Sequence, residues 1–570
     1  MNAAAPGGAA PPHSADLAPR PAHDAGGGRS PWAVLAVLCL GLFMILLDGT
    51  IVNIALPQIM DAFDATLSDV EWVMNAYVLM FAVTLVTLGR FGDLYGRRLL
   101  FVVGMILFTV ASLACGLAPS AAWLIAFRVA QGLGGAAMMP ATLSIVAAVF
   151  PPGQRGAAMG VWGGVSGLAT AIGPSLGGLI VDSASWRWIF LVNIPIGILG
   201  VVLALRIVPE SKDPAAVESL DLPGVALITA SLFCLTFALI EGQSYGWLSG
   251  TILGLFAAAA AAFALFFRRE HRVRQPLIDF SLFRALDFAA GNATGLLLSA
   301  AMMGAFFIIP IFLQSVLGYS AVKAGFVMAP MSAVIIFAAP LAGVLSDRLG
   351  SKWIVAGGMF VLAAGLAWMA GLLPGIGKIS PDTSPADLVV PFAISGIGIG
   401  LAVAPVTSAV MATAPRERVG NASGVLSTMR QVGSLMGIAI LGAVLQNRVT
   451  AAVTEGVRAS SQIPPALKER IVAAAAGGSV QLDIPEPGPG MPATAVQMMR
   501  ALFMGWFTDA MASTFVWAVA LAVAGGLCAL LLRSRAGGPA PHGSGPGHGP
   551  GDAQTTAPDA GAPTPARRPG

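Results

Sequence analysis

Long runs of apolar residues, separated by short polar stretches, cover most of the chain between residues 32 and 532. Each run is about as long as the roughly 20 residues of helix that cross a bilayer. The pattern therefore predicts fourteen membrane-spanning helices in an all-α protein. The expected spans are 32–56, 70–89, 99–118, 122–148, 157–181, 188–207, 222–240, 250–267, 288–316, 323–345, 353–373, 388–412, 421–445 and 510–532.

Outside these spans the chain has two tails and one long loop. Residues 1–31 and 533–570 are rich in Ala, Gly and Pro, and we expect both tails to be disordered. The loop 446–509 contains a helix-like stretch at 465–476 followed by several prolines, and it is predicted to be a flexible external connector. A small external cap is the alternative for this loop.

The composition supports a membrane protein and excludes several other classes. Of the 570 residues, 56% are hydrophobic and 10% are charged, whereas soluble domains carry about 25% charged residues. A net charge of +3 is too small to indicate nucleic-acid binding. The cysteines stand singly, so we expect no metal site, and no motif for a nucleotide or other cofactor is present. No catalytic constellation is visible, so an enzyme is not predicted.

Loop cations set the expected orientation, because cytoplasmic loops are enriched in Lys and Arg. If both termini are cytoplasmic, the short outer loops hold only Arg187, Lys323 and Lys378. The inner loops then hold Arg90, Arg97, Arg98, Arg155, Arg206, Lys212, Arg268, Arg269, Arg272, Arg274, Arg284, Arg348, Lys352, Arg416 and Arg418. This bias predicts a multi-pass protein with cytoplasmic termini in a bacterial cytoplasmic membrane.

Two loops, at 89–98 and 343–352, repeat one pattern of glycine, aspartate, glycine and a final cation. The repeat predicts two six-helix halves, 32–207 and 285–532, with two inserted helices and a basic linker in 208–284. We expect these loops to gate a conformational change, although a plain topology signal is the alternative. The residues concerned are Gly89, Asp93, Gly96, Arg97 and Arg98 in the first copy and Gly343, Asp347, Arg348 and Gly350 in the second.

Asp48 is the most informative single residue. It lies about sixteen residues into its span, where a carboxylate is costly unless it is paired or protonated. Burial favours the protonated form, which suits a proton carrier. Arg128 is its expected partner, because it lies at a similar depth and keeps its charge. Proton coupling is favoured over a structural ion pair, which stays open; for Arg128, snorkelling to the outer interface is the alternative.

A third buried charge, Arg430, lies near the middle of the span 421–445 beside Gln431. A substrate contact, a backbone contact and a role in coupling all remain open for Arg430. Adaptable apolar side chains suit a promiscuous substrate cavity, although packing is the alternative for each one. The candidate cavity residues are Met44, Tyr77, Met138, Met139, Gln314, Arg430 and Gln431, with Met302, Met303 and Met328 as further apolar contacts.

Small residues in the span 157–181 allow close helix contact, and Pro174 allows a bend. Gly173, Pro174, Gly177 and Gly178 are therefore further gating candidates, with ordinary packing as the alternative.

Taken together, these residues resemble the major facilitator superfamily. The run from Leu47 to Pro57 is similar to the first-helix motif of its fourteen-helix drug:proton antiporters, the EmrB/QacA group. Arg128 with Gln131-Gly132 resembles the fourth-helix motif, and Gly173-Pro174 with Gly177-Gly178 resembles the fifth-helix antiporter motif. The runs 186–195, 314–325 and 420–431 are also similar to that group.

The resemblance implies export of amphipathic drugs in exchange for protons, with the bilayer, a proton and a small molecule as partners. A periplasmic adaptor joins them only if the source is Gram-negative. A dedicated exporter of one metabolite or self-made antibiotic is the nearest alternative, and the sequence does not separate the two. A nutrient importer and a membrane-embedded enzyme or sensor are weaker alternatives.

Overall fold

The computed structural model describes residues 30–65, 67–212, 221–273, 276–278, 280–373, 379–414, 419–459, 468–469 and 493–533. All regular structure among these residues is helical. The helices of the first half are α1 (Pro31–Phe63), α2 (Leu67–Tyr95), α3 (Arg97–Gly116), α4 (Ala121–Val149), α5 (Pro152–Ser183), α6 (Trp188–Leu191) and α7 (Asn193–Ile207). Two helices follow, α8 (Leu222–Tyr245) and α9 (Gly250–Glu270).

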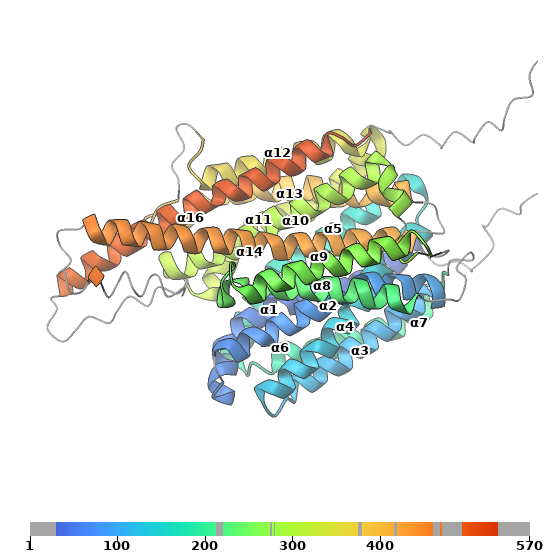
Figure 1. The fold of residues 1–570 in the computed structure, drawn as a ribbon, viewed down its shortest axis with the longest axis horizontal. Coiled ribbons are helices and arrows are strands. Elements are labelled where there is room, and N and C mark those ends of the chain that lie inside the picture. The colour runs from blue at the N-terminus through green and yellow to red at the C-terminus, as the bar shows by residue number, and fades with distance from the viewer. Residues whose placement is uncertain are drawn as a thin grey trace, which may run out of the picture.

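The helices of the second half are α10 (Leu286–Ile311), α11 (Ala321–Leu349), α12 (Ser351–Met369), α13 (Pro385–Thr413), α14 (Val419–Ala459) and α16 (Ala493–Ala529). A 3₁₀ turn, η1 (Phe280–Arg284), precedes α10, and a π-helical turn, η2 (Phe312–Val316), ends it. Figure 1 shows α1–α4 and α7 along one side of the bundle and α10, α12, α13 and α16 along the other.

Local chemistry explains where several helices begin. Ser120, Ser249 and Ser320 accept a hydrogen bond from a backbone N–H in the first turn of α4, α9 and α11. Gly96 and Gly350 separate α2 from α3 and α11 from α12 with φ of 124° and 85°. These backbone conformations favour glycine, so the two repeated loops turn the chain in the same way. We call the end of the bundle that holds Gly96 and Gly350 the motif end.

Thirteen helical segments among the described residues are long and apolar enough to cross a membrane. The predicted span 157–181 corresponds to α5, which is not one of the thirteen; several of its side chains lie outside the described part of the chain. Helix α5 nevertheless packs between α1 and α11. The exact number of fourteen spans therefore stays a prediction, whereas the multi-pass helical fold is confirmed.

The predicted external connector 446–509 is wrong at both of its ends. Helix α14 continues to Ala459, and α16 already begins at Ala493. Leu445, Val449, Val453 and Val457 form a buried stripe on α14 in the same core cluster as Phe503 and Phe507 of α16. Because this stripe packs against α16, α14 stays helical beyond residue 445 although its other face is polar. The predicted helix at 465–476 lies outside the described residues, apart from 468–469.

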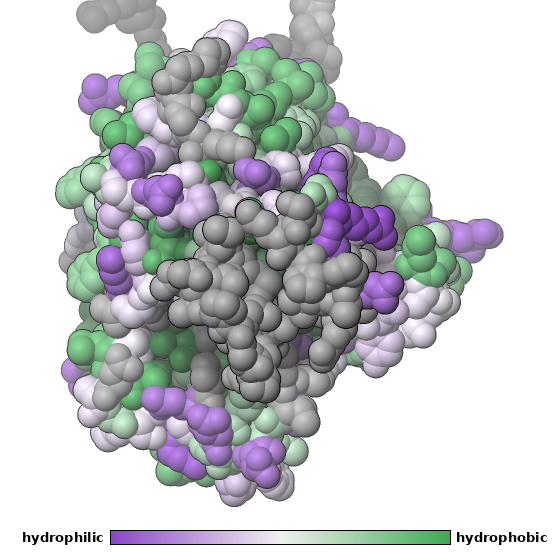
Figure 2. Space-filling view, turned by 90° about the vertical axis from the view of Figure 1, so that its left-hand side faces the viewer, coloured by the Kyte–Doolittle hydropathy of each residue, from purple (hydrophilic) through white to green (hydrophobic). Residues whose placement is uncertain are grey.

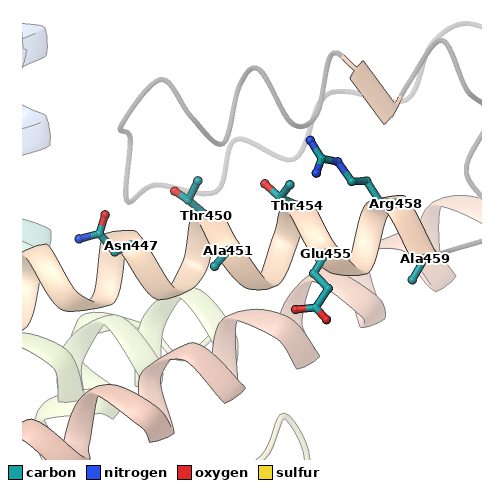
Figure 3. A pocket seen from close by; sticks show the side chains of 7 residues that line it. All are labelled: Asn447, Thr450, Ala451, Thr454, Glu455, Arg458 and Ala459. Atoms are coloured by element: carbon teal, nitrogen blue, oxygen red, sulfur yellow. The ribbon is translucent and has the colours of Figure 1, made fainter.

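The two long helices protrude from the end opposite the motif end (Figure 1). At 41 residues, α14 is about 62 Å long, roughly twice the hydrocarbon thickness. Thr450, Thr454 and Arg458 point to one side of its last turns (Figure 3). The end face seen in Figure 2 carries many hydrophilic residues with hydrophobic ones toward its margins. This end is therefore suited to face water.

Helices α8 and α9 form a hairpin at the junction of the two halves. Helix α8 packs against α2 of the first half and α14 of the second. Ile228 and Leu232 of α8 share a buried apolar cluster with Val83 of α2 and Leu426 of α14. The inserted hairpin thus covers one side of the seam between the halves.

Candidate functional site

Asp48 lies in α1 with its side chain fully buried. Arg128 of α4 forms an ion pair with Asp48, with its Nη1 atom donating to Oδ2. Gln131 donates from Nε2 to Asp48 Oδ1 at 2.7 Å, and Asn193 of α7 donates from Nδ2 to the same oxygen at 3.4 Å. Both carboxylate oxygens are therefore hydrogen-bonded, as a buried charge in this position requires. The predicted pairing of Asp48 with Arg128 is confirmed.

Arg128 is itself fixed on several sides. It donates from Nε to the carbonyl of Val73 at 2.9 Å and from Nη1 to Gln131 Oε1 at 2.7 Å. Its guanidinium lies 4.2 Å from the ring centroid of Tyr77, which donates from its hydroxyl to the carbonyl of Ile45 at 3.2 Å. The aromatic face adds cation–π stabilisation to the buried arginine. Tyr77 therefore supports Arg128 here.

Three polar residues around Asp48 were not among the predicted site residues. Ser112 of α3 accepts from Gln131 at 2.7 Å and from Asn193 at 3.3 Å, which links all three in one network. Asn193 Oδ1 is buried without a hydrogen-bond partner. A polar residue alone in an apolar run was the available sequence signal for Ser112 and Asn193, and Gln131 follows Arg128 by nearly one helical turn.

At the motif end, Asp93 and Arg97 form an ion pair at 2.9 Å, and both side chains are buried. Arg98 donates from Nη1 to the carbonyl of Val208 at 3.4 Å. Glu210, which was not predicted, accepts from the backbone N–H groups of Arg98 and Leu99 at 3.1 and 3.2 Å. A carboxylate in this place caps the N-terminus of α3.

The second copy of the repeat is less fully described. Like Gly96 in the first copy, Gly350 has a positive φ, here of 85°, and Arg348 is exposed. The side chain of Asp347 lies outside the described part of the chain, so its predicted part in gating stays a prediction.

Several predicted glycines lie where helices meet. A Cβ added to Gly343 of α11 would lie 1.9 Å from the carbonyl oxygen of Gly156 of α5. A Cβ on Gly424 of α14 would contact the Cα of Gly89 of α2 at 3.9 Å. At both glycine contacts, a helix of the first half touches a helix of the second half at the motif end. Close backbone approach of this kind requires small residues.

The glycines of α5 lie against the helix that carries Asp48. A Cβ on Gly173 would lie 1.9 Å from Thr50 Oγ1, and one on Gly177 would lie 3.0 Å from the carbonyl of Ile51. Gly178 is buried, and α5 continues as one helix through Pro174, whose side chain lies outside the described set. The glycines thus set how closely α5 packs on α1.

The predicted cavity residues fall into separate environments. Met44 and Met138 are fully buried in the core of the first half, which favours the packing alternative for these two. Met139 is half-buried, and Gln314 is exposed in η2 at the end of α10. Arg430 and Gln431 are half-buried on α14, and the Arg430 guanidinium lies 5.6 Å from the ring centroid of Trp162 of α5. Met44, Tyr77, Met138 and Met139 thus share one apolar cluster of the first half, to which the Trp162 ring beside Arg430 also belongs, whereas Gln314 is not part of that cluster.

Known proteins resemble this chain over most of its length. The family model described as Major Facilitator Superfamily matches residues 38–438. The chain is 36% identical over 419 residues to the "Tetracenomycin C resistance and export protein" of Streptomyces glaucescens, covering 74% of this chain and 77% of that protein. It is 38% identical over 418 residues to the "Multidrug resistance protein Stp" of Mycobacterium tuberculosis, covering 73% and 76%.

A solved structure supports the fold. The human organic anion transporter MFSD10 (TETRAN) superposes with a TM-score of 0.51 at 14% identity, covering 87% of this chain and all of that chain. At this identity the likeness concerns the fold alone. The sequence relatives and the match to the family model decide the classification, and the chain belongs to the Major Facilitator Superfamily.

Proposed function

We propose that this protein exports drugs or other amphipathic small molecules across a bacterial cytoplasmic membrane in exchange for protons. The names of its relatives, one a multidrug resistance protein and one a resistance and export protein, support export. The buried carboxylate of Asp48 carries the proposal of proton coupling, because an acid inside a membrane protein usually marks an ion pathway.

Asp48 is the proposed proton carrier and Arg128 the group that adjusts its charge. When Asp48 takes up a proton, its ion pair with Arg128 is lost, while Arg128 keeps its bonds to Val73 and Gln131. Asn193 can then help, since rotation of its amide would turn the unpartnered Oδ1 toward the protonated carboxyl group. The network can thus accommodate both charge states of Asp48.

The motif end is assigned to the cytoplasm, with both termini on that side, because the loop cations gather there. Contacts between the halves, at Gly343 with Gly156 and at Gly424 with Gly89, close this end. In the proposed cycle these contacts open as one half rocks against the other. The repeated loops, including the Asp93–Arg97 ion pair, are the proposed latch.

A dedicated exporter of one metabolite is the second candidate function. The relative whose name specifies tetracenomycin C export favours it. A broad panel of drugs separates the two proposals, since a dedicated exporter would respond to few or none of them. A periplasmic adaptor is proposed only for a Gram-negative source.

The test is substrate-dependent proton flux in everted membrane vesicles, read with a pH-sensitive dye. Wild-type vesicles should lose their pH gradient on addition of a transported drug, and vesicles with Asp48→Asn should not. Full coupled flux in Asp48→Asn would make the carboxylate structural and reject the proposed mechanism. A wild type that responds to no drug of a broad panel would favour the dedicated exporter.

A further inference from the structure

Helix α14 carries a polar face that is turned toward the first half of the molecule. Ser423, Ser427, Arg430, Gln431 and Ser434 are spaced so that they share one side of the helix. Near the motif end of this face, Ser423 hydrogen-bonds to Ser144 of α4 at 2.8 Å. Farther along α14 from the motif end, the Arg430 guanidinium lies 5.6 Å from the ring centroid of Trp162 of α5. Both partners belong to the first half, so the face lies between the halves.

Arg430 is a cation without a counterion in this arrangement. Its Nη1 atom is buried and has no hydrogen-bond partner. Three ion pairs are found within the described ranges, and none of them includes Arg430. Ser427 Oγ, one turn away, is also buried without a partner. An uncompensated charge at such a place is costly, and such residues usually mark a functional site.

The depth of Arg430 excludes an ordinary interfacial position. It follows the start of α14 by eleven residues, or about 16 Å of helix, which is close to half of a hydrocarbon core about 30 Å thick. Arg430, Gln431 and Ser434 are nevertheless half-buried rather than sealed. Polar side chains at this depth, on a face between the halves, are placed to meet a transported molecule.

Trp162 holds the arginine in place. Its side chain is 1% exposed, and its Nε1 atom donates to Thr142 Oγ1 of α4 at 3.4 Å. The ring therefore offers a fixed face to the guanidinium, which leaves the N–H groups of Arg430 free to bind. Trp162 is thus a positioning residue, and the half-buried Met139, one helical turn from Thr142, supplies adaptable apolar surface nearby.

We infer that Arg430 binds the anionic group of the exported molecule, so that the preferred substrates are organic anions with a carboxylate or sulfonate on an apolar body. A planar guanidinium matches a carboxylate with two parallel hydrogen bonds, and Gln431 and Ser427 can add donors beside it. This inference rests on the proposed export function and names its substrate class. An anionic lipid headgroup would offer the same chemistry, and the experiment separates the two sources.

The experiment measures equilibrium binding to the purified full-length protein in nanodiscs of phosphatidylcholine. Three probes share one ring system and differ in charge: 2-naphthoate, 2-naphthamide and 2-naphthylmethylammonium. Wild type should bind naphthoate at least tenfold more tightly than either of the others. Equal affinities, or no saturable binding of naphthoate, would overturn the inference. Replacing part of the phosphatidylcholine by phosphatidylglycerol should leave the affinity for naphthoate unchanged. A loss of naphthoate affinity in phosphatidylglycerol would mean that the site binds an anionic lipid headgroup.

Variants then locate the site. Arg430→Gln should remove the preference for naphthoate, Arg430→Lys should keep part of it, and Trp162→Leu should weaken naphthoate binding alone. Arg206→Gln, which replaces an exposed arginine of α7, is the matched control and should bind like wild type. A preference that survives in folded Arg430→Gln would refute the assignment. If Arg430→Gln does not fold, the naphthoate preference of Arg430→Lys and the wild-type affinities for the three probes still test the anion site.

Binding needs no proton gradient, so this result is independent of coupling at Asp48. Loss of the naphthoate preference with intact drug-driven proton flux would reject the anion site and leave the proposed function standing. If the protein keeps its preference for naphthoate but shows no drug-driven proton flux, the anion site stands and the proposed proton-coupled export is rejected.

Discussion

The hydroxyl groups of Ser144 and Ser423 lie 2.8 Å apart although 279 positions separate them in the chain. Ser144 belongs to α4 in the first half and Ser423 to α14 in the second. Ser423 also donates to the carbonyl of Pro140 at 3.3 Å. These bonds join the two halves near the motif end, beside the glycine contact of Gly424 with Gly89. Any rocking motion that opens this end must separate the two serines.

Cysteines at these two positions should lock the motif end. In a variant without the four native cysteines, Ser144→Cys with Ser423→Cys should form a disulfide under mild oxidation, because the side chains already touch. Drug-driven proton flux should stop on oxidation and return on reduction. Each single cysteine variant is the control and should be insensitive to the oxidant. Full flux in the cross-linked protein would show that this end does not open during transport.

The close contact of Gly343 with Gly156 should tolerate no side chain. A methyl group at Gly343 would meet the Gly156 carbonyl at 1.9 Å, so Gly343→Ala should force α11 and α5 apart. Overpacking of this kind costs about 1–3 kcal/mol. The apparent melting temperature in detergent should fall for Gly343→Ala. Gly357→Ala on α12 is the matched control, since a Cβ there meets no atom within 4 Å. Equal melting temperatures for the two variants would contradict the observed packing.

The sequence was sufficient to predict most of the fold. Apolar length located the spans, and the repeated loops placed equivalent turns at Gly96 and Gly350. The extension of α14 to Ala459 was missed because a hydropathy window averages over all faces of a helix. Its stripe of Leu445, Val449, Val453 and Val457 is a one-sided signal that becomes decisive only when α16 packs on it. Which helix packs against such a stripe depends on the tertiary structure and cannot be read from the stripe itself.

For the candidate site, sequence reasoning identified the charged pair but not its surroundings. A lone Asp48 within an apolar span demands a partner, and Arg128 was the charge at matching depth. Ser112 and Asn193 come from helices whose rotation about their axes the sequence did not determine. The same limit affected Met44 and Met138, which turned out to be core residues. Depth along a helix is readable from sequence, whereas the direction in which a side chain points depends on packing.

The Asp221–Arg269 ion pair should contribute to stability in a pH-dependent way. Hydrogen bonds from Arg269, at 2.7 to 2.9 Å, lower the pKa of Asp221 below its usual 3.8. A depressed folded pKa means that the contribution is present above the usual pKa and is lost as the pH falls through the lower, folded value. Asp221→Asn should therefore lower the melting temperature near neutral pH, and the difference from wild type should shrink in acid. The effect should be small, since Arg269 is 39% exposed and solvent screens the pair.

Asp382→Asn is the control for the acid experiment. Asp382 is exposed, and its substitution should leave the difference from wild type near zero at every pH. A melting-temperature difference for Asp221→Asn that grows as the pH falls would mean that the ion pair does not lower the pKa of Asp221 in the folded protein.

Removing one partner of the Asp48–Arg128 pair should destabilise the protein more than removing both. Arg128→Met leaves a buried carboxylate whose main counterion is gone, at a cost of about 3–5 kcal/mol for a folded state that stays ionised. Asp48→Asn leaves Arg128 charged, although the carbonyl of Val73 and the ring of Tyr77 still stabilise it. The double variant buries no unpaired charge, so it should regain much of the stability that Arg128→Met loses.

Melting temperatures of the four proteins, measured in one detergent, give this comparison, and drug-driven proton flux on the same samples separates stability from coupling. The double variant should be folded and inactive in coupled transport, because it lacks the group that carries the proton. Additive losses of stability in the double variant would show that the two side chains do not depend on each other. Coupled flux in the stable double variant would place the proton-carrying group elsewhere in the protein.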